Sequence, residues 1–459
     1  METLNVFFHN LSGFLWGWPM IILLVGTHIF LTIRLRFPQR KILMAIKLSV
    51  TRDKEASGDV SQFGALATAL AATIGTGNIV GIATAVSLGG PGAVFWCWIT
   101  GIFGIATKYG EGLLAIKYRV KTADGMMLGG PMYALERGLG WKWMAVLFAI
   151  FASLSSFGIG STVQANAIST IINESFSVSP WITGSVVTLL VSLVVIGGIR
   201  SIARVCGALV PAMALFYVLG CLYILIINGP YIGPAIQLIV SSAFTGEAAG
   251  AGFVGGSIMM AARYGIARGL FSNESGLGSA PIVAAAAQTR NSVRQALVSS
   301  TGTFWDTVVI CALTGIVIVS SIMAHPDIII ENEATLTQQA FSKIPYVGMP
   351  LLNFGLFTFA FSTILGWCYY GERCVEYLYR RRSHQAIFIY RVLYILAVFM
   401  GSVISLGMVW NFADCMNALM ALPNLISLLL LSGVLVAETK KYLWNNQLDK
   451  WDDEMIIDK

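Results

Sequence analysis

The chain has 459 residues, of which 56% are hydrophobic and only 11% are charged, whereas soluble domains average about 45–50% apolar and about 25% charged residues. These few charges cannot cover the surface of a cytosolic globular protein of this length, and the apolar content also excludes a disordered or nucleic-acid-binding chain. The formal net charge of +6 comes from Lys and Arg residues that flank apolar segments, as is typical of a membrane protein.

Eleven apolar segments are long enough to cross a membrane as helices, which takes about 20 mostly apolar residues. In chain order they cover approximately residues 12–33, 61–88, 91–117, 143–172, 180–198, 206–227, 252–288, 297–323, 350–378, 386–407 and 410–436. The first segment has no basic region before it and is followed by Arg34 and Arg36, so we interpret it as a span and not as a cleavable signal peptide.

Basic residues predict the orientation, because Lys and Arg are enriched in cytoplasmic loops. Clusters follow the first, third, fifth, seventh and ninth spans and occupy the tail: Arg34, Arg36, Arg40, Lys41, Lys47, Arg52 and Lys54; Lys117, Arg119, Lys121, Arg137 and Lys142; Arg200 and Arg204; Arg290 and Arg294; Arg380, Arg381 and Arg382; Lys440, Lys441, Lys450 and Lys459. The loops on the other side contain only Lys343. We therefore expect a multi-pass protein of the cell (inner or plasma) membrane with its N-terminus outside and its C-terminus in the cytoplasm.

Two of the predicted spans are interrupted by glycine and small polar residues. Residues 71–81 read AATIGTGNIVG, and residues 268–279 read RGLFSNESGLGS. Non-helical backbone at membrane depth is tolerated only where it lines a cavity or is buried in protein, although small residues also allow helices to pack closely. Glu274 favours a cavity at the second interruption, because a carboxylate in lipid is costly.

The two interrupted spans each open a block of five helices, and blocks with an odd number of helices have opposite topology. Paired interruptions in inverted halves predict a transporter binding site. The layout assigns residues 1–60 to an extra N-terminal transmembrane helix with a basic cytoplasmic loop, 61–228 to the first five-helix repeat, 229–251 to an external loop with a surface helix, 252–437 to the second, inverted repeat, and 438–459 to a cytoplasmic tail. The expected fold class is an all-α polytopic membrane protein.

Five sequence stretches between the second and tenth spans resemble the alanine or glycine:cation symporter family. They are GTGNIVGIATAVSLGGPGAVFWCW (75–98), GGPMYALERGLG (129–140), VQANAI (163–168), ARGLFSNESGLGSAP (267–281) and LFTFAFSTILGWCYYGE (356–372). Ser275 departs mildly from the family pattern, which usually has Ala there. The resemblance implies a five-plus-five inverted-repeat fold of the leucine-transporter type and sodium-coupled uptake of alanine or glycine.

A zwitterionic substrate needs partners for a carboxylate and an ammonium group. Backbone amides of Thr76 and Gly77 suit the carboxylate, because glycine allows close approach and freed amides attract anions. Asn78 either reaches the site or only caps the following half-helix. The other predicted substrate-binding residues come from the fourth span, the second interruption and the ninth span: Gln164, Phe271, Asn273, Gly276, Thr363 and Trp367. Gln164 as an interhelical hydrogen-bonding residue and Trp367 as a packing residue remain alternatives.

Sodium prefers oxygen ligands, which unwound carbonyls and hydroxyls supply. By resemblance to the fold, the sodium ligands are expected between the first interruption and the ninth span: Ala71, Ile74, Phe359, Ser362 and Thr363. The hydroxyls by themselves are weak evidence, since Ser and Thr commonly bond to the backbone of their own helix.

We expect a secondary active symporter that imports small neutral amino acids by alternating access, with sodium as the co-transported ion and no other cofactor. Proton coupling through Glu274, Asp306 or Asp414 is the alternative within transport. A membrane-embedded enzyme would need a catalytic constellation, and a channel would need a pore-loop or charged-ring signature; the sequence has neither. Lys108 and Glu111, three residues apart on one helix, are predicted to pair.

Overall fold

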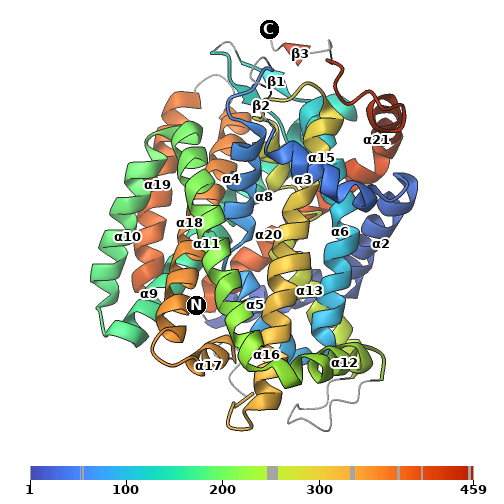
Figure 1. Ribbon diagram of the computed structural model, residues 1–459. Coiled ribbons are helices and arrows are strands. Elements are labelled where there is room, and N and C mark those ends of the chain that lie inside the picture. The colour runs from blue at the N-terminus through green and yellow to red at the C-terminus, as the bar shows by residue number, and fades with distance from the viewer. Residues whose placement is uncertain are drawn as a thin grey trace.

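The computed structural model describes residues 2–457 apart from residues 52, 54–55, 123, 246–256, 331–335, 380–382, 405–406 and 453–455. The predicted basic residues at 52, 54, 380–382 and 459, and the beginning of the predicted span 252–288, lie outside the described residues. What is described is almost entirely helical, and the helices form one upright bundle (Figure 1).

The first part of the chain contains α1 (Glu2–Leu15), α2 (Trp18–Arg34), η1 (Pro38–Lys41), α3 (Ile42–Ser49), α4 (Gln62–Thr73), η2 (Thr76–Asn78), α5 (Val80–Gly89), α6 (Gly92–Lys117), β1 (Val120–Lys121), β2 (Met127–Leu128), α7 (Pro131–Tyr133), η3 (Ala134–Gly138), α8 (Lys142–Ser155), η4 (Ser156–Thr162), α9 (Val163–Phe176), α10 (Pro180–Val195), α11 (Gly198–Ile227) and α12 (Gly229–Thr245). It continues with α13 (Ile258–Asn273), α14 (Ala280–Ala284), α15 (Ser292–Thr303), η5 (Phe304–Cys311), α16 (Ala312–Ala324), α17 (Leu336–Ser342), α18 (Gly348–Tyr379), α19 (Ser383–Val403), α20 (Gly407–Leu430), α21 (Ser432–Thr439), η6 (Lys440–Trp444) and β3 (Ile456–Ile457). Among these, η4 and η5 are π-helical segments.

Each of the eleven ranges predicted to span the membrane contains at least one helix among the described residues. By length and composition, seven continuous helices among the described residues can cross a membrane, or eight when the bent pair α4–α5 counts as one span. This establishes a multi-pass helical protein. The predicted count of eleven spans goes beyond this finding. Three of the eleven ranges do not meet these criteria: α10 is shorter, α13–α14 is broken, and α6 is not among the helices that pass by length and composition.

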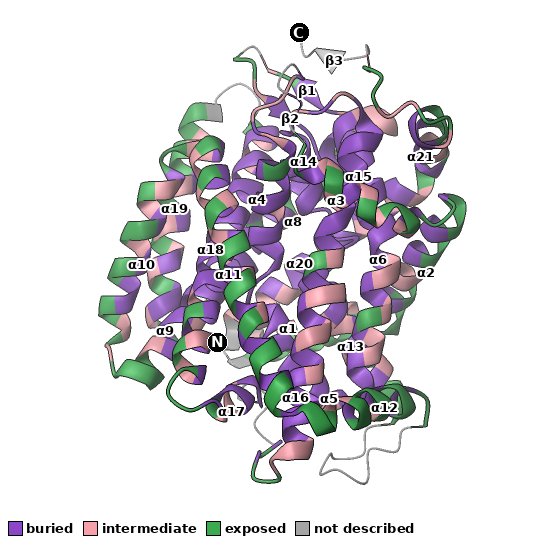
Figure 2. Cartoon of the chain, in the orientation of Figure 1, coloured by how far each residue is buried: buried purple, intermediate pink, exposed green. Residues whose placement is uncertain are grey.

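The distribution of buried residues is that of a membrane protein. Large apolar side chains face outward on the peripheral helices α10, α11 and α19, for example Leu193, Ile226 and Phe388. The buried residues concentrate in the centre of the bundle, where α4, α8, α14 and α18 lie (Figure 2). An apolar exterior around this centre suits lipid contact.

The two predicted interruptions are real breaks. Between α4 and α5 the chain turns by 61°. After α13, Glu274, Gly276 and Gly278 adopt positive φ angles of 53°, 93° and 86° before α14 begins. These left-handed conformations favour glycine because it has no Cβ, which explains the two glycines in the second break.

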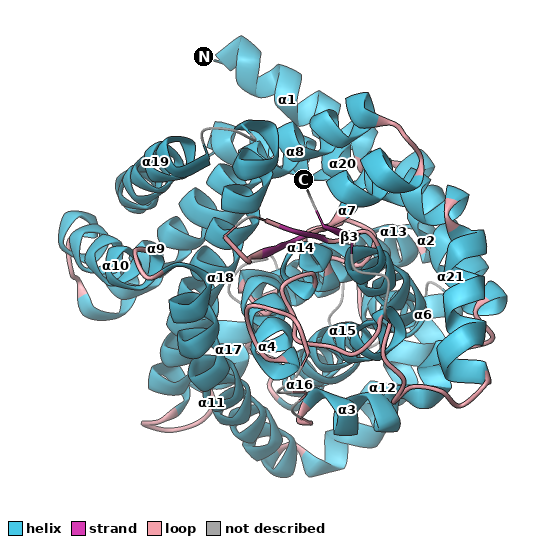
Figure 3. Cartoon of the chain, turned by 90° about the horizontal axis from the view of Figure 1, so that it is seen from above, coloured by secondary structure: helices cyan, strands magenta, loops and turns pink. Residues whose placement is uncertain are grey.

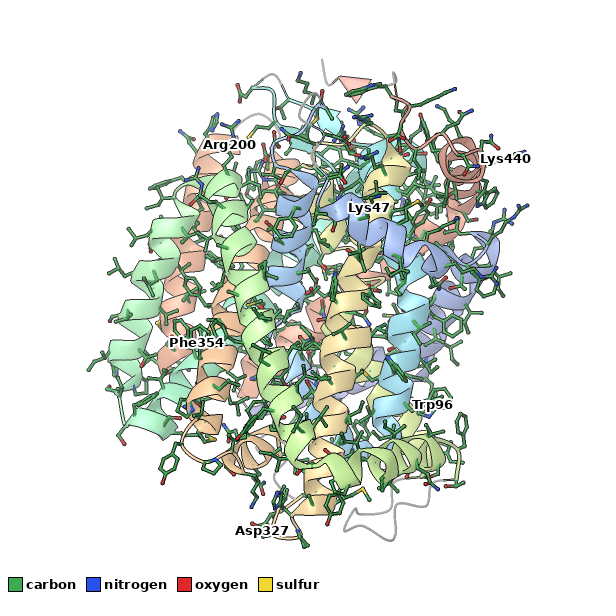
Figure 4. All side chains as sticks on the ribbon, viewed as in Figure 1. Lys47, Trp96, Arg200, Asp327, Phe354 and Lys440 are labelled. Atoms are coloured by element: carbon green, nitrogen blue, oxygen red, sulfur yellow. The ribbon has the colours of Figure 1, made fainter. Side chains whose placement is uncertain are left out.

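One end of the bundle contains most of the predicted basic clusters, and we call it the basic end. Figure 4 shows Lys47, Arg200 and Lys440 toward this end and Asp327 at the opposite end. A small sheet lies across the basic end, with strand order β2-β1-β3, where β1 pairs antiparallel with β2 and parallel with β3. Figure 3 views the bundle from this side, with the strands above its centre.

Candidate functional site

Helix α18 contacts the first break through two hydroxyl groups. Ser362 Oγ donates to the carbonyl oxygen of Ala71 at 3.2 Å, and Thr363 Oγ1 donates to the same carbonyl at 3.1 Å. Each hydroxyl also lies within 3.0 Å of the carbonyl oxygen of Phe359. Four of the five predicted sodium ligands therefore lie together. Ile74, the fifth, directly follows α4 and is 1% exposed.

Two glycines permit this close approach. A Cβ placed on Gly75 would lie 2.7 Å from Thr363 Oγ1, and one on Gly366 would lie 2.7 Å from the Cβ of Ala72. Either substitution would push α18 away from the break. The glycines thus bring backbone and hydroxyl oxygens to the distances at which a small cation can be shared.

Gln164 lies beside the same break with an unpaired acceptor. Its Nε2 donates to the carbonyl of Ile159 at 3.2 Å. Its Oε1 is buried without a hydrogen-bond partner among the described residues and lies 3.6 Å from where a Cβ on Gly75 would be. A buried, unpaired amide oxygen is costly, so a ligand with N–H groups would be stabilised there.

The second break covers the first through an aromatic ring. A Cβ on Gly77 would meet Cδ1 and Cε1 of Phe271 at 3.3 and 3.5 Å. The ring therefore lies directly on the glycine backbone whose amide is the predicted carboxylate partner. Asn273, two residues further on, accepts from the backbone N–H of Ser275 at 2.8 Å, while its buried Nδ2 has no partner in the described part of the chain.

Asn78 is bonded within the protein on both sides of its amide. Its Oδ1 accepts from the backbone N–H of Gly75 at 3.1 Å, and its Nδ2 donates to Asp306 Oδ1 at 2.6 Å. The geometry is that of a cap on the break. Contact between Asn78 and substrate remains a prediction.

Glu111 forms hydrogen bonds with the second break, a contact that the sequence did not predict. Its Oε1 accepts from the backbone N–H groups of Gly276 and Gly278 at 3.0 and 3.1 Å and from Asn424 Nδ2 at 2.7 Å. The N–H of Gly276 is therefore occupied by protein, and its predicted contact with substrate is left untested. The predicted Lys108–Glu111 pair is wrong for this structure, because Lys108 Nζ has no hydrogen-bond partner among the described residues.

Trp367 joins α18 to the second break. Its indole Nε1 donates to Glu274 Oε1 at 3.1 Å, and Ser279 Oγ donates to the other carboxylate oxygen. Gly160 leaves space for the Cβ of Trp367, because a Cβ on Gly160 would lie only 2.3 Å from it. The buried carboxylate of Glu274 is thus paired with two donors, as burial of a charge requires.

The two breaks, α18 and the η4–α9 helix therefore enclose one polar region deep in an apolar bundle. The amino-acid sequence matches the model of the sodium:alanine symporter family over residues 1–455. The chain belongs to the sodium:alanine symporter family. It is a sodium-coupled amino-acid symporter, and this membership excludes the enzyme alternative.

Curated members of the family are similar over nearly the whole chain. The sodium/alanine symporter AgcS of Methanococcus maripaludis is 49% identical over 442 residues, covering 95% of this chain and 96% of AgcS. A Haemophilus influenzae transporter is 48% identical over 460 residues, covering 99% of this chain and all of the relative. Membership in the sodium:alanine symporter family thus confirms the predicted resemblance.

A solved transporter shows the fold. The crystal structure of MhsT in complex with L-phenylalanine aligns with a TM-score of 0.57 at 15% identity, covering 86% of this chain and 94% of MhsT. A likeness at this identity shows the fold alone. It agrees with the predicted leucine-transporter type of architecture for this symporter.

Sequence reasoning missed the contacts that connect helices of this symporter. The sequence suggests Asp306 only as a candidate for proton coupling and predicts Lys108 as the partner of Glu111, whereas Glu111 bonds to the second break. The apolar context of both charges was the available signal. The π-helical segments η4 and η5 were not predicted from the sequence, although such segments are frequent at functional sites.

Proposed function

We propose that this symporter imports alanine and glycine together with sodium, that sodium binds between the first break and α18, and that the substrate binds between the two breaks. The observation that carries the proposal is the convergence of Ser362 and Thr363 on the carbonyl of Ala71. A bound sodium ion would take these oxygens as ligands, with the carbonyls of Phe359 and Ile74 completing the set. The hydroxyl protons would then turn away, since a cation binds oxygen lone pairs.

The substrate carboxylate is assigned to the backbone amides of Thr76 and Gly77. These are the first residues of η2, and the first N–H groups of a helix have no partner inside it. A helix N-terminus also carries partial positive charge. Asn78 would hold this turn in shape through its bond to the N–H of Gly75, which makes it a positioning residue in the proposal.

The substrate ammonium group is assigned to Gln164. Its Oε1 has no hydrogen-bond partner among the described residues and lies beside the first break, 3.6 Å from where a Cβ on Gly75 would be. An ammonium has three donors and no acceptor, so it complements this oxygen. Asn273 Nδ2 has no partner in the part of the chain that the structure describes and would serve the carboxylate or a bridging water.

The substrate must be small. Phe271 covers Gly77, and Trp367 is 1% exposed and held by Glu274. Large side chains from two elements, α13 and α18, thus limit the space around the break, which favours the hydrogen or methyl side chains of glycine and alanine. Gly276 would shape the second break through its bond with Glu111 without direct contact with the substrate.

The membrane topology is also part of the proposal. We assign eleven spans in two inverted five-helix repeats, residues 61–228 and 252–437, after one extra N-terminal span. Basic residues at one end of the bundle (Figure 4) support a cytoplasmic C-terminus and an outside N-terminus. Helix α12 lies in the segment 229–251 at the end opposite to the C-terminus (Figure 1), which supports an external surface helix.

Uptake of radiolabelled alanine into proteoliposomes tests the proposal. We expect an inward sodium gradient to drive accumulation at constant pH, and a proton gradient without sodium to drive none. Unlabelled glycine should compete, whereas leucine and phenylalanine should not. Equal uptake with and without sodium would overturn the sodium assignment, and uptake that does not saturate would indicate a channel.

A further inference from the structure

Asp306 contacts both breaks at once. It is fully buried in η5, and three groups donate to its carboxylate. Asn78 Nδ2 donates to Oδ1 at 2.6 Å, whereas Ser272 Oγ and Thr307 Oγ1 donate to Oδ2 at 2.9 and 2.7 Å. Asn78 belongs to the first break, and Ser272 lies in the last turn of α13 before the second. Thr307 belongs to the same helical segment as Asp306.

Cys311 reaches the same two partners. Its Sγ lies 3.3 Å from Asn78 Nδ2 and 3.2 Å from Ser272 Oγ. Residues five apart point to different sides of an α-helix, but a π-helix forms its hydrogen bonds between residues i and i+5. The π-helical geometry of η5 therefore places Asp306 and Cys311 on one face, against both breaks.

We infer that Asp306 is the positioning residue that makes the two broken helices move as one unit. If only one break moved, the buried carboxylate of Asp306 would lose one of its hydrogen-bond donors, and no water would replace that donor. Leaving a buried carboxylate without a donor costs free energy. A joint movement keeps all the bonds. Asp306 touches neither the proposed sodium ligands nor the proposed substrate partners, so it acts through Asn78 and Ser272.

This coupling has a thermodynamic consequence. If sodium and substrate both favour the same arrangement of a two-state element, each raises the affinity for the other by the same factor. The inference rests on the proposed placement of both ligands at the breaks. Cutting the link between Asp306 and one break should reduce that factor while leaving each ligand's own contacts in place.

Two single substitutions separate coupling from simple loss of a hydrogen bond. Ser272→Ala and Thr307→Ala each remove one hydroxyl that donates to Asp306 Oδ2, but only Ser272 connects to a break. The measurement is alanine binding to the purified full-length protein at low and at saturating sodium. In the wild type we expect sodium to raise alanine affinity by about tenfold, within the range usual for such couplings.

Ser272→Ala should lower this factor to about twofold, and Thr307→Ala should leave it at the wild-type value. Asp306→Ala should also lower it, and Asp306→Asn should restore part of it, because the amide oxygen still accepts from Asn78. If Asp306→Ala does not fold, the comparison of the coupling factor between Ser272→Ala and Thr307→Ala still tests the inference.

Cys311 offers an independent readout. With the other six cysteines replaced by Ala, we expect sodium plus alanine to slow thiol labelling of Cys311 in the wild-type background about tenfold and to have little effect after Ser272→Ala. Unchanged sodium–alanine coupling in folded Ser272→Ala, or a loss in Thr307→Ala equal to that in Ser272→Ala, would overturn the inference. Absence of any sodium effect in the wild type would instead contradict the proposed function.

Discussion

The indole N–H of Trp367 donates a 3.1 Å hydrogen bond to the carboxylate of Glu274, across 93 residues of sequence. Glu274 adopts a left-handed conformation with φ of 53° at the end of α13, which is unusual for a residue with a side chain. Together with the bond from Ser279, the bond from Trp367 stabilises a carboxylate that is buried inside the bundle. It attaches the second break to α18, the helix that also holds the first break.

Two substitutions of Trp367 should distinguish the effect of its volume from the effect of its hydrogen bond to Glu274. Trp367→Phe keeps an aromatic ring but leaves Glu274 with Ser279 as its side-chain donor, which should cost about 1.5–3 kcal/mol and lower the thermal stability. Trp367→Ala should in addition open the pocket, so that larger amino acids compete for alanine uptake. If Trp367→Ala only unfolds the protein and Trp367→Phe is indistinguishable from wild type, the tryptophan is a packing residue.

The sodium assignment predicts a specific role for Thr363. Thr363→Val keeps the branched shape but removes the hydroxyl that reaches Ala71, so the sodium concentration for half-maximal uptake should rise about tenfold or more. Thr358→Val is the matched control, because the Thr358 hydroxyl bonds only to carbonyls of its own helix, those of Phe354 and Gly355. Similar sodium dependence in both variants would contradict the assignment.

A side chain at position 77 should block the substrate carboxylate. The first atom of that side chain would already meet the ring of Phe271 at 3.3 Å, so Gly77→Ala should slow uptake and Gly77→Val should abolish it while the protein still folds. Gly81→Ala is the control, since the nearest atom to its Cβ is 4.0 Å away. Alanine methyl ester should not compete for uptake; strong competition would show that the carboxylate is not bound there.

Glu111 should matter for stability more than for ligand binding. Glu111→Ala leaves the N–H groups of Gly276 and Gly278 and the amide of Asn424 without their shared acceptor, which should cost about 3 kcal/mol or more. Glu111→Gln retains an acceptor oxygen and should recover most of this loss. The check is the unfolding temperature of the two purified variants, and equal temperatures would show that these bonds contribute little.

Local features of the sequence predicted both breaks, whereas the contact between α18 and the first break was expected from the resemblance to the family's fold. The glycine and small polar residues at 75–78 and 272–279 cannot continue a stable helix, and helical periodicity brings Phe359 and Thr363 to one face. Both signals lie within a single segment, so they can be recognised without knowing which helices are neighbours.

Tertiary structure alone decided the partners of the buried charges. Helical spacing suggested that Glu111 pairs with Lys108, but Glu111 accepts from the second break, and Asp306 bonds to Asn78 across 228 residues. Inside a membrane protein a buried charge is stabilised by whichever donors packing brings within about 3 Å. These donors come from elements distant in sequence, so spacing along one helix carries no information about them.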